Sequence, residues 1–196
     1  MCSNRILVQA GIYDRFAAAL VEAVNKLTVG AGIKPGTTIG PLINREAIAK
    51  VETLVGDAVN KGAKVLVGGA TDAAGPLFYR PSVVGDVTPD MEIVREEIFG
   101  PVAALVRFDT EDDAVRLAND TPFGLAAYLF SQNLSRAWRV AEKLDAGMVG
   151  VNEGIFSNEV VPFGGVKESG LGREGAAEGL DEYLELKYIC LGAIDA

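Results

Sequence analysis

Strand-like and helix-like segments alternate along the whole chain, and this alternation constrains the fold more than any other feature. Short apolar runs predict buried strands, and apolar residues at helical spacing predict the helices between them. The expected strands are residues 5–10, 64–67, 78–87, 102–108, 126–130, 147–151 and 183–191, and the expected helices are residues 12–27, 44–61, 110–119, 133–144 and 176–180. Such alternation with short connections builds a layered α/β domain with a mostly parallel sheet.

Composition fits a folded chain and excludes several classes of function. Hydrophobic residues make up 49% and charged residues 23%, which is globular composition. No run approaches the roughly 18 apolar residues that a membrane helix needs, and no signal-peptide pattern follows the first residues. We therefore expect a cytoplasmic protein that binds no membrane. The net charge of −9 argues against a nucleic-acid partner.

Catalysis by histidine is excluded within this chain, because it contains none. Ser-His-Asp and Cys-His sites and His-ligated metal centres are therefore ruled out. Cys2 and Cys190 lie at opposite ends and make neither a zinc site nor a disulfide framework, so we expect no bound metal. Cys2 is a candidate nucleophile by residue type, but no base is placed to activate it.

Two loops combine glycine, proline, charges and aromatic rings in a way that packing does not require. They are residues 95–101 (REEIFGP) and residues 162–175 (PFGGVKESGLGREG). Loops of this composition hold a defined shape, and binding residues collect on such loops. Residues 170–175 fit G-x-G-x-x-G, but a loop precedes them, so a turn into a short helix is favoured over a dinucleotide-binding fingerprint.

The first loop carries two adjacent carboxylates, Glu96 and Glu97. Adjacent residues in extended backbone point to opposite faces, so at most one of the two enters a pocket. Glu97 and Phe99 share a face, and a carboxylate beside an aromatic ring suits a pair of ribose hydroxyls next to a flat ring. The alternative is that both carboxylates face solvent or form salt bridges.

The last apolar segment, from Tyr183 to Leu191, follows the final helix and places aromatic and charged residues at alternate positions. A terminal strand of this kind pairs either with the edge of another subunit or within its own sheet. The residues alone leave both alternatives open.

Taken together, four motifs resemble the aldehyde dehydrogenase superfamily. They are E-E-x-F-G-P at residues 96–101, N-x-x-x-x-G-L at 119–125, P-F-G-G-x-K-x-S-G at 162–170 and C-S-N-R at 2–5. The resemblance covers essentially the whole chain and is nearest to the succinate-semialdehyde dehydrogenases. It implies the last two-fifths of an enzyme: a three-layer αβα catalytic domain over residues 1–180, then an oligomerisation strand and tail over residues 181–196.

The resemblance also implies roles for four side chains. Glu97 would bind the nicotinamide ribose of NAD or NADP, and Phe99 would pack near the nicotinamide. Ser157 would hydrogen-bond the far carboxylate of the substrate, and Phe163 would line the substrate pocket. The segment from residue 183 to 191 would join subunits into a homo-oligomer, with Arg173 and Glu185 near that interface.

The chain departs from the family pattern at its start. In the family the nucleophilic cysteine lies five residues before the arginine of the C-x-N-R segment, and counting back from Arg5 reaches position zero. Cys2 therefore matches the neighbour of the nucleophile. The general base and the cofactor-binding domain would also lie upstream, so we expect no catalytic residue in this chain and no activity from it alone.

The leading interpretation is part of an NAD(P)-dependent enzyme that oxidises an aldehyde, succinate semialdehyde, to a carboxylate through a cysteine thiohemiacetal. One alternative is a non-catalytic fragment that acts as an oligomerisation or interaction module, or as half of a split enzyme. A further alternative is a thiol-dependent esterase that uses Cys2.

Overall fold

The computed structural model describes residues 3–155 and 158–193. The chain divides into two compact units, residues 1–118 and residues 119–196, and each is described by itself. Within the described residues, no helix is long and apolar enough to cross a membrane. Cys2 and Ser157 lie outside the described residues.

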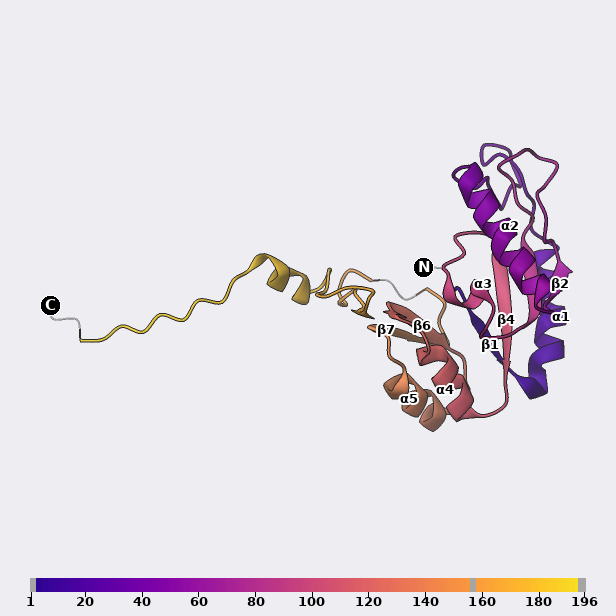
Figure 1. Ribbon diagram of the computed structural model, residues 1–196. Helices are drawn as coiled ribbons and strands as arrows, with labels where there is room; N and C mark the ends of the chain where they lie inside the picture. Colours follow the sequence, from indigo (N-terminus) through magenta and orange to yellow (C-terminus); the bar gives the residue numbers. More distant parts are fainter. Residues whose placement is uncertain (1–2, 156–157, 194–196) are drawn as a thin grey trace. The chain divides into compact units, whose positions relative to one another are not determined.

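The first unit contains a four-stranded sheet with helices around it (Figure 1). Its elements are β1 (Ile6–Gln9), η1 (Ala10–Ile12), α1 (Tyr13–Val24), α2 (Arg45–Asn60), β2 (Lys64–Val67), β3 (Ser82–Val87), α3 (Glu92–Arg95) and β4 (Val102–Phe108), and α4 (Glu111–Asn119) ends at the division between the units. The strand order is β1-β4-β3-β2. Strand β4 runs parallel to β1 and β3, and only β2 is antiparallel to its neighbour. The expected mostly parallel sheet is confirmed.

Residues that alternate along β3 and β4 place the helices on opposite faces of the sheet. Val83 and Leu105 pack in one cluster with Tyr13 and Ala17 of α1. Their strand neighbours Val84, Ala104 and Val106 pack in the other cluster with five residues of α2. Because successive side chains of a strand point to opposite faces, α1 and α2 cover the two sides of the sheet. This arrangement shows the expected three-layer αβα architecture in the first unit.

Helix α2 forms where the sequence predicts it. The side-chain oxygen of Asn44 accepts a hydrogen bond of 2.8 Å from the backbone N–H of Ala47, which satisfies a donor that the first turn leaves free. Buried residues recur at helical spacing along the helix: Ile48, Val51, Leu54, Val55 and Ala58. Gly62 follows the helix with a φ of 104°, a conformation that glycine adopts without strain.

Helix α4 is fixed at both ends by polar side chains. The Thr110 hydroxyl accepts from the backbone N–H of Asp113 at 3.2 Å at the N-terminal end. At the other end, the Arg5 guanidinium donates to the carbonyl oxygens of Leu117 and Ala118 at 2.7 and 2.9 Å. A cation at the carboxyl end of a helix also complements the helix dipole.

The second unit is built around a β-α-β connection. Its elements are β5 (Phe123–Gly124), β6 (Ala126–Leu129), α5 (Leu134–Lys143), β7 (Met148–Val151), β8 (Val166–Lys167) and η2 (Glu178–Tyr183). Strands β6 and β7 pair in parallel, and α5 connects them. Strands β5 and β8 pair antiparallel, which joins two of the motifs that the sequence singles out.

Two expected strands differ in the structure. The strand expected over residues 78–87 begins only at Ser82, because Pro81 has no N–H to donate to a neighbouring strand. The strand expected over residues 183–191 is not formed: Tyr183 ends η2, and residues 184–193 have no regular secondary structure. A strand requires a paired neighbour, and no strand in the described part of this chain pairs with that segment. Pairing within its own sheet is therefore wrong for the single chain.

Candidate functional site

The loop between α3 and β4 presents two of the predicted binding residues. Ile98 is buried, with 3% of its surface exposed, whereas Glu97 before it and Phe99 after it are both exposed. The Phe99 ring is 74% exposed although it belongs to a large apolar side chain. The structure thus brings Glu97 and Phe99 together at the surface of the first unit, on either side of one buried anchor.

The side chain of Asn4 holds this loop through three hydrogen bonds. Its amide nitrogen donates to the carbonyl oxygens of Ile93 and Glu96 at 3.2 and 3.0 Å. Its amide oxygen accepts from the backbone N–H of Ile98 at 2.9 Å. Sequence reasoning assigned Asn4 no role, although it belongs to the C-S-N-R motif. Membership of that motif was the signal that could have identified it.

The C-terminal half of the loop packs against helix α2 and bonds to strand β3. A Cβ atom at Gly100 would lie 2.5 Å from Cγ2 of Val51, so the loop backbone packs directly on α2. The carbonyl oxygen of Pro101 accepts from the backbone N–H of Ser82 at 2.8 Å. The glycine and proline of the E-E-x-F-G-P motif therefore fix the path of the backbone into β4.

Phe99 has an unusual backbone conformation, with a φ of 49°. A left-handed conformation at a bulky residue other than glycine costs on the order of 1–3 kcal/mol. Because the ring is mostly exposed, its burial contributes little to the stability of this chain and does not offset that cost. The surrounding contacts therefore impose this conformation on Phe99.

Phe163, the third predicted residue, lies in the second unit. It is half-buried, and its backbone N–H and carbonyl oxygen both bond to Glu174, at 2.8 Å each. The guanidinium of Arg173 donates to the carbonyl oxygens of Gly165 and Gly172 at 2.8 and 2.7 Å. These contacts close the loop of residues 162–175 on itself and hold Phe163 in place.

Glycines in this second loop make turns. Gly170, Gly172 and Gly175 have φ values of 112°, 71° and 71°, and the 3₁₀ helix η2 follows them. Only the two-residue strand β8 precedes them. The structure agrees with the predicted turn into a short helix and not with a dinucleotide-binding fingerprint.

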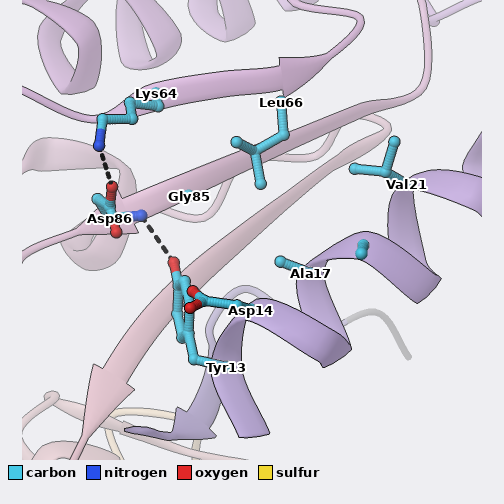
Figure 2. Close-up of a pocket in the computed structure, with 9 residues that line it drawn as sticks. Tyr13, Asp14, Ala17, Val21, Lys64, Leu66, Gly85 and Asp86 are labelled. Atoms are coloured by element: carbon cyan, nitrogen blue, oxygen red, sulfur yellow. Dashed lines mark hydrogen bonds and ion pairs between the residues drawn. The ribbon is translucent and has the colours of Figure 1, made fainter.

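A separate cavity of about 370 Å³ lies between α1 and strands β2 and β3 (Figure 2). Its polar groups are already paired. The Tyr13 hydroxyl accepts from the N–H of Asp86 at 2.7 Å and donates to the carbonyl oxygen of Leu105 at 3.3 Å. The Lys64 ammonium lies 2.9 Å from the Asp86 carboxylate, which raises the pKa of Lys64. Burial raises the pKa of Tyr13. Neither Glu97 nor Phe99 lines this cavity, which we interpret as part of the scaffold.

Comparisons with known proteins agree with the motifs. Residues 1–189 match the aldehyde dehydrogenase family. The mitochondrial succinate-semialdehyde dehydrogenase of Arabidopsis thaliana is 62% identical over 192 residues, which are 98% of this chain and 36% of that enzyme. The NADP(+) succinate-semialdehyde dehydrogenase of Escherichia coli strain K12 is 53% identical over 98% of this chain and 40% of its own length.

The fold matches solved structures equally well. The crystal structure of succinate-semialdehyde dehydrogenase from Burkholderia pseudomallei superimposes with a TM-score of 0.95 and 54% identity, over 98% of this chain and 40% of that one. The chain thus spans about two-fifths of the length of the relatives it matches. Residues 1–189 of the 196 match the family, and the fold is similar to that of a solved member. The chain therefore belongs to the aldehyde dehydrogenase family.

Proposed function

We propose that the chain is the C-terminal part of an NAD(P)-dependent dehydrogenase that oxidises succinate semialdehyde to the carboxylate. The observation that carries the proposal is the loop that presents an exposed Glu97 and an exposed, strained Phe99. The names of the relatives at 62% and 53% identity support succinate semialdehyde as the substrate.

Glu97 and Phe99 have the chemistry that a nicotinamide nucleotide requires. A carboxylate accepts hydrogen bonds from ribose hydroxyls, and an aromatic ring packs against a flat heterocycle. Both side chains are exposed, so each is accessible to a ligand. When bound, the nicotinamide supplies the acceptor for the hydride. The cofactor is NAD or NADP: the name of the E. coli relative specifies NADP(+), and a related betaine aldehyde dehydrogenase from Staphylococcus aureus was solved with NAD+.

Two residues of the second unit are proposed to meet the substrate. Phe163 lines the substrate pocket, and its backbone is held by Glu174. Ser157, which lies outside the described residues, donates a hydrogen bond to the carboxylate of the substrate that does not react. A site built to bond a charged group rejects analogues that lack it, so these contacts favour a semialdehyde over a simple aldehyde.

The covalent step is assigned to a cysteine that is not among these 196 residues. A thiolate adds to the aldehyde carbon to give a thiohemiacetal, and the loss of hydride then gives a thioester that water hydrolyses. We therefore propose that the chain alone has no dehydrogenase activity.

A hybrid enzyme tests this proposal. Residues 1–196 of this chain replace the matching region of the Arabidopsis enzyme, and the formation of NADH or NADPH is measured with succinate semialdehyde and with butanal. We expect turnover by the hybrid enzyme, a preference for the semialdehyde, and none from the chain alone. A folded hybrid without turnover, or one that prefers butanal, would contradict the proposal.

A second candidate function is assembly through residues 183–191. This segment exposes a series of large apolar side chains, namely Tyr183, Leu184, Leu186, Tyr188, Ile189 and Leu191. Apolar side chains that are exposed in a row mark surfaces that bind another chain. We propose that the segment adds as a strand to another subunit of a homo-oligomer. A native mass equal to that of the monomer, or an oligomer unchanged by deletion of residues 183–196, would contradict this assignment.

A further inference from the structure

We propose that Asn4 is a positioning residue for the nicotinamide cofactor, because it imposes the loop conformation that presents Glu97 and Phe99. The inference rests on the proposed function for the identity of the ligand. It goes beyond that function by assigning the orientation of the binding loop to a residue 92 positions away from Glu96 in the sequence.

The Asn4 amide uses all of its donors and its acceptor on one short segment. An asparagine side chain has two N–H donors and one carbonyl oxygen. Both donors bond to carbonyl oxygens of the segment, those of Ile93 and Glu96, and the acceptor bonds to the N–H of Ile98. No other side chain of this length supplies the same combination: aspartate lacks the donors, and alanine lacks both donors and acceptor.

These bonds bracket Glu97, which lies two residues before the strained Phe99. Glu97 lies between the two backbone groups that Asn4 holds, the carbonyl of Glu96 and the N–H of Ile98. Phe99 directly follows Ile98 and has a φ of 49°. The orientation of both side chains therefore depends on the same amide.

The local structure around the loop is too short to maintain this conformation by itself. Helix α3 has only four residues, and its C-terminal cap residue is Glu96. Helices of one turn have almost no stability of their own. Loss of the Asn4 bonds would let Phe99 relax to a negative φ, and the ring would then point elsewhere. Displacement of a binding group by about 1 Å is enough to weaken a productive complex about a hundredfold.

The first experiment uses the 196-residue chain and needs no cofactor. Amide hydrogen exchange is measured at Ile98 and Phe99 in the unaltered chain and in Asn4→Ala, Asn4→Asp and the control Asn60→Ala. Asn60 is an exposed asparagine at the end of α2. We expect exchange at Ile98 to accelerate about tenfold or more in Asn4→Ala, because the bond that protects this N–H is lost. Exchange at the buried core residue Val84 should not change in any variant.

Asn4→Asp separates the donors from the acceptor of this side chain. It keeps an oxygen for the Ile98 N–H but offers no N–H to Ile93 and Glu96. We expect Ile98 to stay protected in this variant while the NMR shifts of Glu96 and Glu97 move. This variant also keeps the test valid if Asn4→Ala fails to fold. Unchanged exchange at Ile98 in Asn4→Ala would overturn the inference.

The second experiment places the same variants in the hybrid enzyme. We expect the KM for the cofactor and the Kd for NADPH or NADH, measured by fluorescence, to rise about tenfold in Asn4→Ala. The KM for succinate semialdehyde and the kcat at saturating cofactor should stay within about twofold. A purely structural defect would instead lower the apparent kcat and leave the cofactor Kd unchanged. An unchanged cofactor Kd in Asn4→Ala would overturn only the role of Asn4. A hybrid enzyme that keeps Asn4 and shows no turnover would overturn the proposed function.

Discussion

The ammonium group of Lys167 donates a hydrogen bond to the backbone carbonyl oxygen of Asn119 at 3.0 Å, across 48 residues of sequence. It also bonds to the carbonyl oxygen of Thr121 at 3.2 Å and lies 3.4 Å from the Asp145 carboxylate. Ser169, two residues further on, accepts from the N–H of Gly124 at 2.9 Å. The P-F-G-G-x-K-x-S-G and N-x-x-x-x-G-L motifs are therefore two halves of one structural unit.

Substitution of Lys167 by Met should destabilise the second unit by about 1 kcal/mol, because two exposed hydrogen bonds to backbone carbonyls are lost. Trp138 is the only tryptophan and lies in α5, so its fluorescence during urea unfolding reports on this unit. Lys26→Met is the matched control, because Lys26 is an exposed residue that pairs only one turn away, with Glu22 at 3.0 Å. Its effect should stay within about 0.5 kcal/mol. Equal effects of the two substitutions would contradict this account.

Replacement of Phe99 by Asn should leave the chain at least as stable and should weaken cofactor binding. Asparagine adopts a positive φ more readily than phenylalanine, and the ring that is removed is mostly exposed. In the hybrid enzyme, loss of the ring should raise the cofactor Kd about three- to tenfold. Urea unfolding and a fluorescence titration measure the two effects. Lower stability with unchanged affinity would mean that Phe99 is a packing residue.

Acid should destabilise the first unit partly through Asp57. The Lys61 ammonium at 2.8 Å and the Glu92 N–H at 2.8 Å lower the pKa of the Asp57 carboxyl. A pKa that is lower in the folded chain contributes stability that is present above the unfolded value and is lost as pH falls through the folded value.

The wild-type stability should therefore fall below about pH 4, and Asp57→Asn should show a shallower fall. Part of the fall will remain in that variant, because hydroxyl donors, Thr88 and Thr110, also lower the pKa of Asp90 and Asp113. Urea unfolding between neutral pH and pH 3 measures both slopes. Identical slopes would contradict the assignment.

Two buried tyrosines should respond oppositely to the loss of their hydroxyl groups. The Tyr79 hydroxyl is buried and has no hydrogen-bond partner among the described residues, so Tyr79→Phe should leave stability unchanged or raise it by up to about 1 kcal/mol. Tyr13→Phe removes two hydrogen bonds and should cost about 1–3 kcal/mol. Urea unfolding followed by circular dichroism compares the two, and a larger loss in Tyr79→Phe would reveal an undetected partner.

Local rules predicted the scaffold well because its determinants lie close together in sequence. The Asn44 cap, the apolar spacing of α2 and the turn at Gly62 all act within a few residues of one another. Strand β4 matches its predicted range, Val102–Phe108, because its apolar residues Val102–Val106 lie in a strand that pairs with β1 on one side and with β3 on the other.

The contacts that shape the binding loops could not be predicted in the same way. Asn4 and Ile98 are 94 residues apart, and no local pattern shows that an asparagine before a strand will hold a distant loop. The prediction of a strand over residues 183–191 failed for another reason. Alternation of apolar and polar residues predicts a strand, but a strand forms only where another strand pairs with it. The sequence shows the preference of this segment for an extended strand, but it does not show which strand would pair with it.

A comparison of Glu97→Gln with Glu96→Gln in the hybrid enzyme tests the central claim most directly. The two residues are adjacent and both are exposed, and each substitution removes one charge with little change in size. We predict that Glu97→Gln raises the cofactor KM about tenfold, while Glu96→Gln leaves it unchanged. Equal effects of the two substitutions, or a larger effect of Glu96→Gln, would contradict the assignment of this loop to the cofactor.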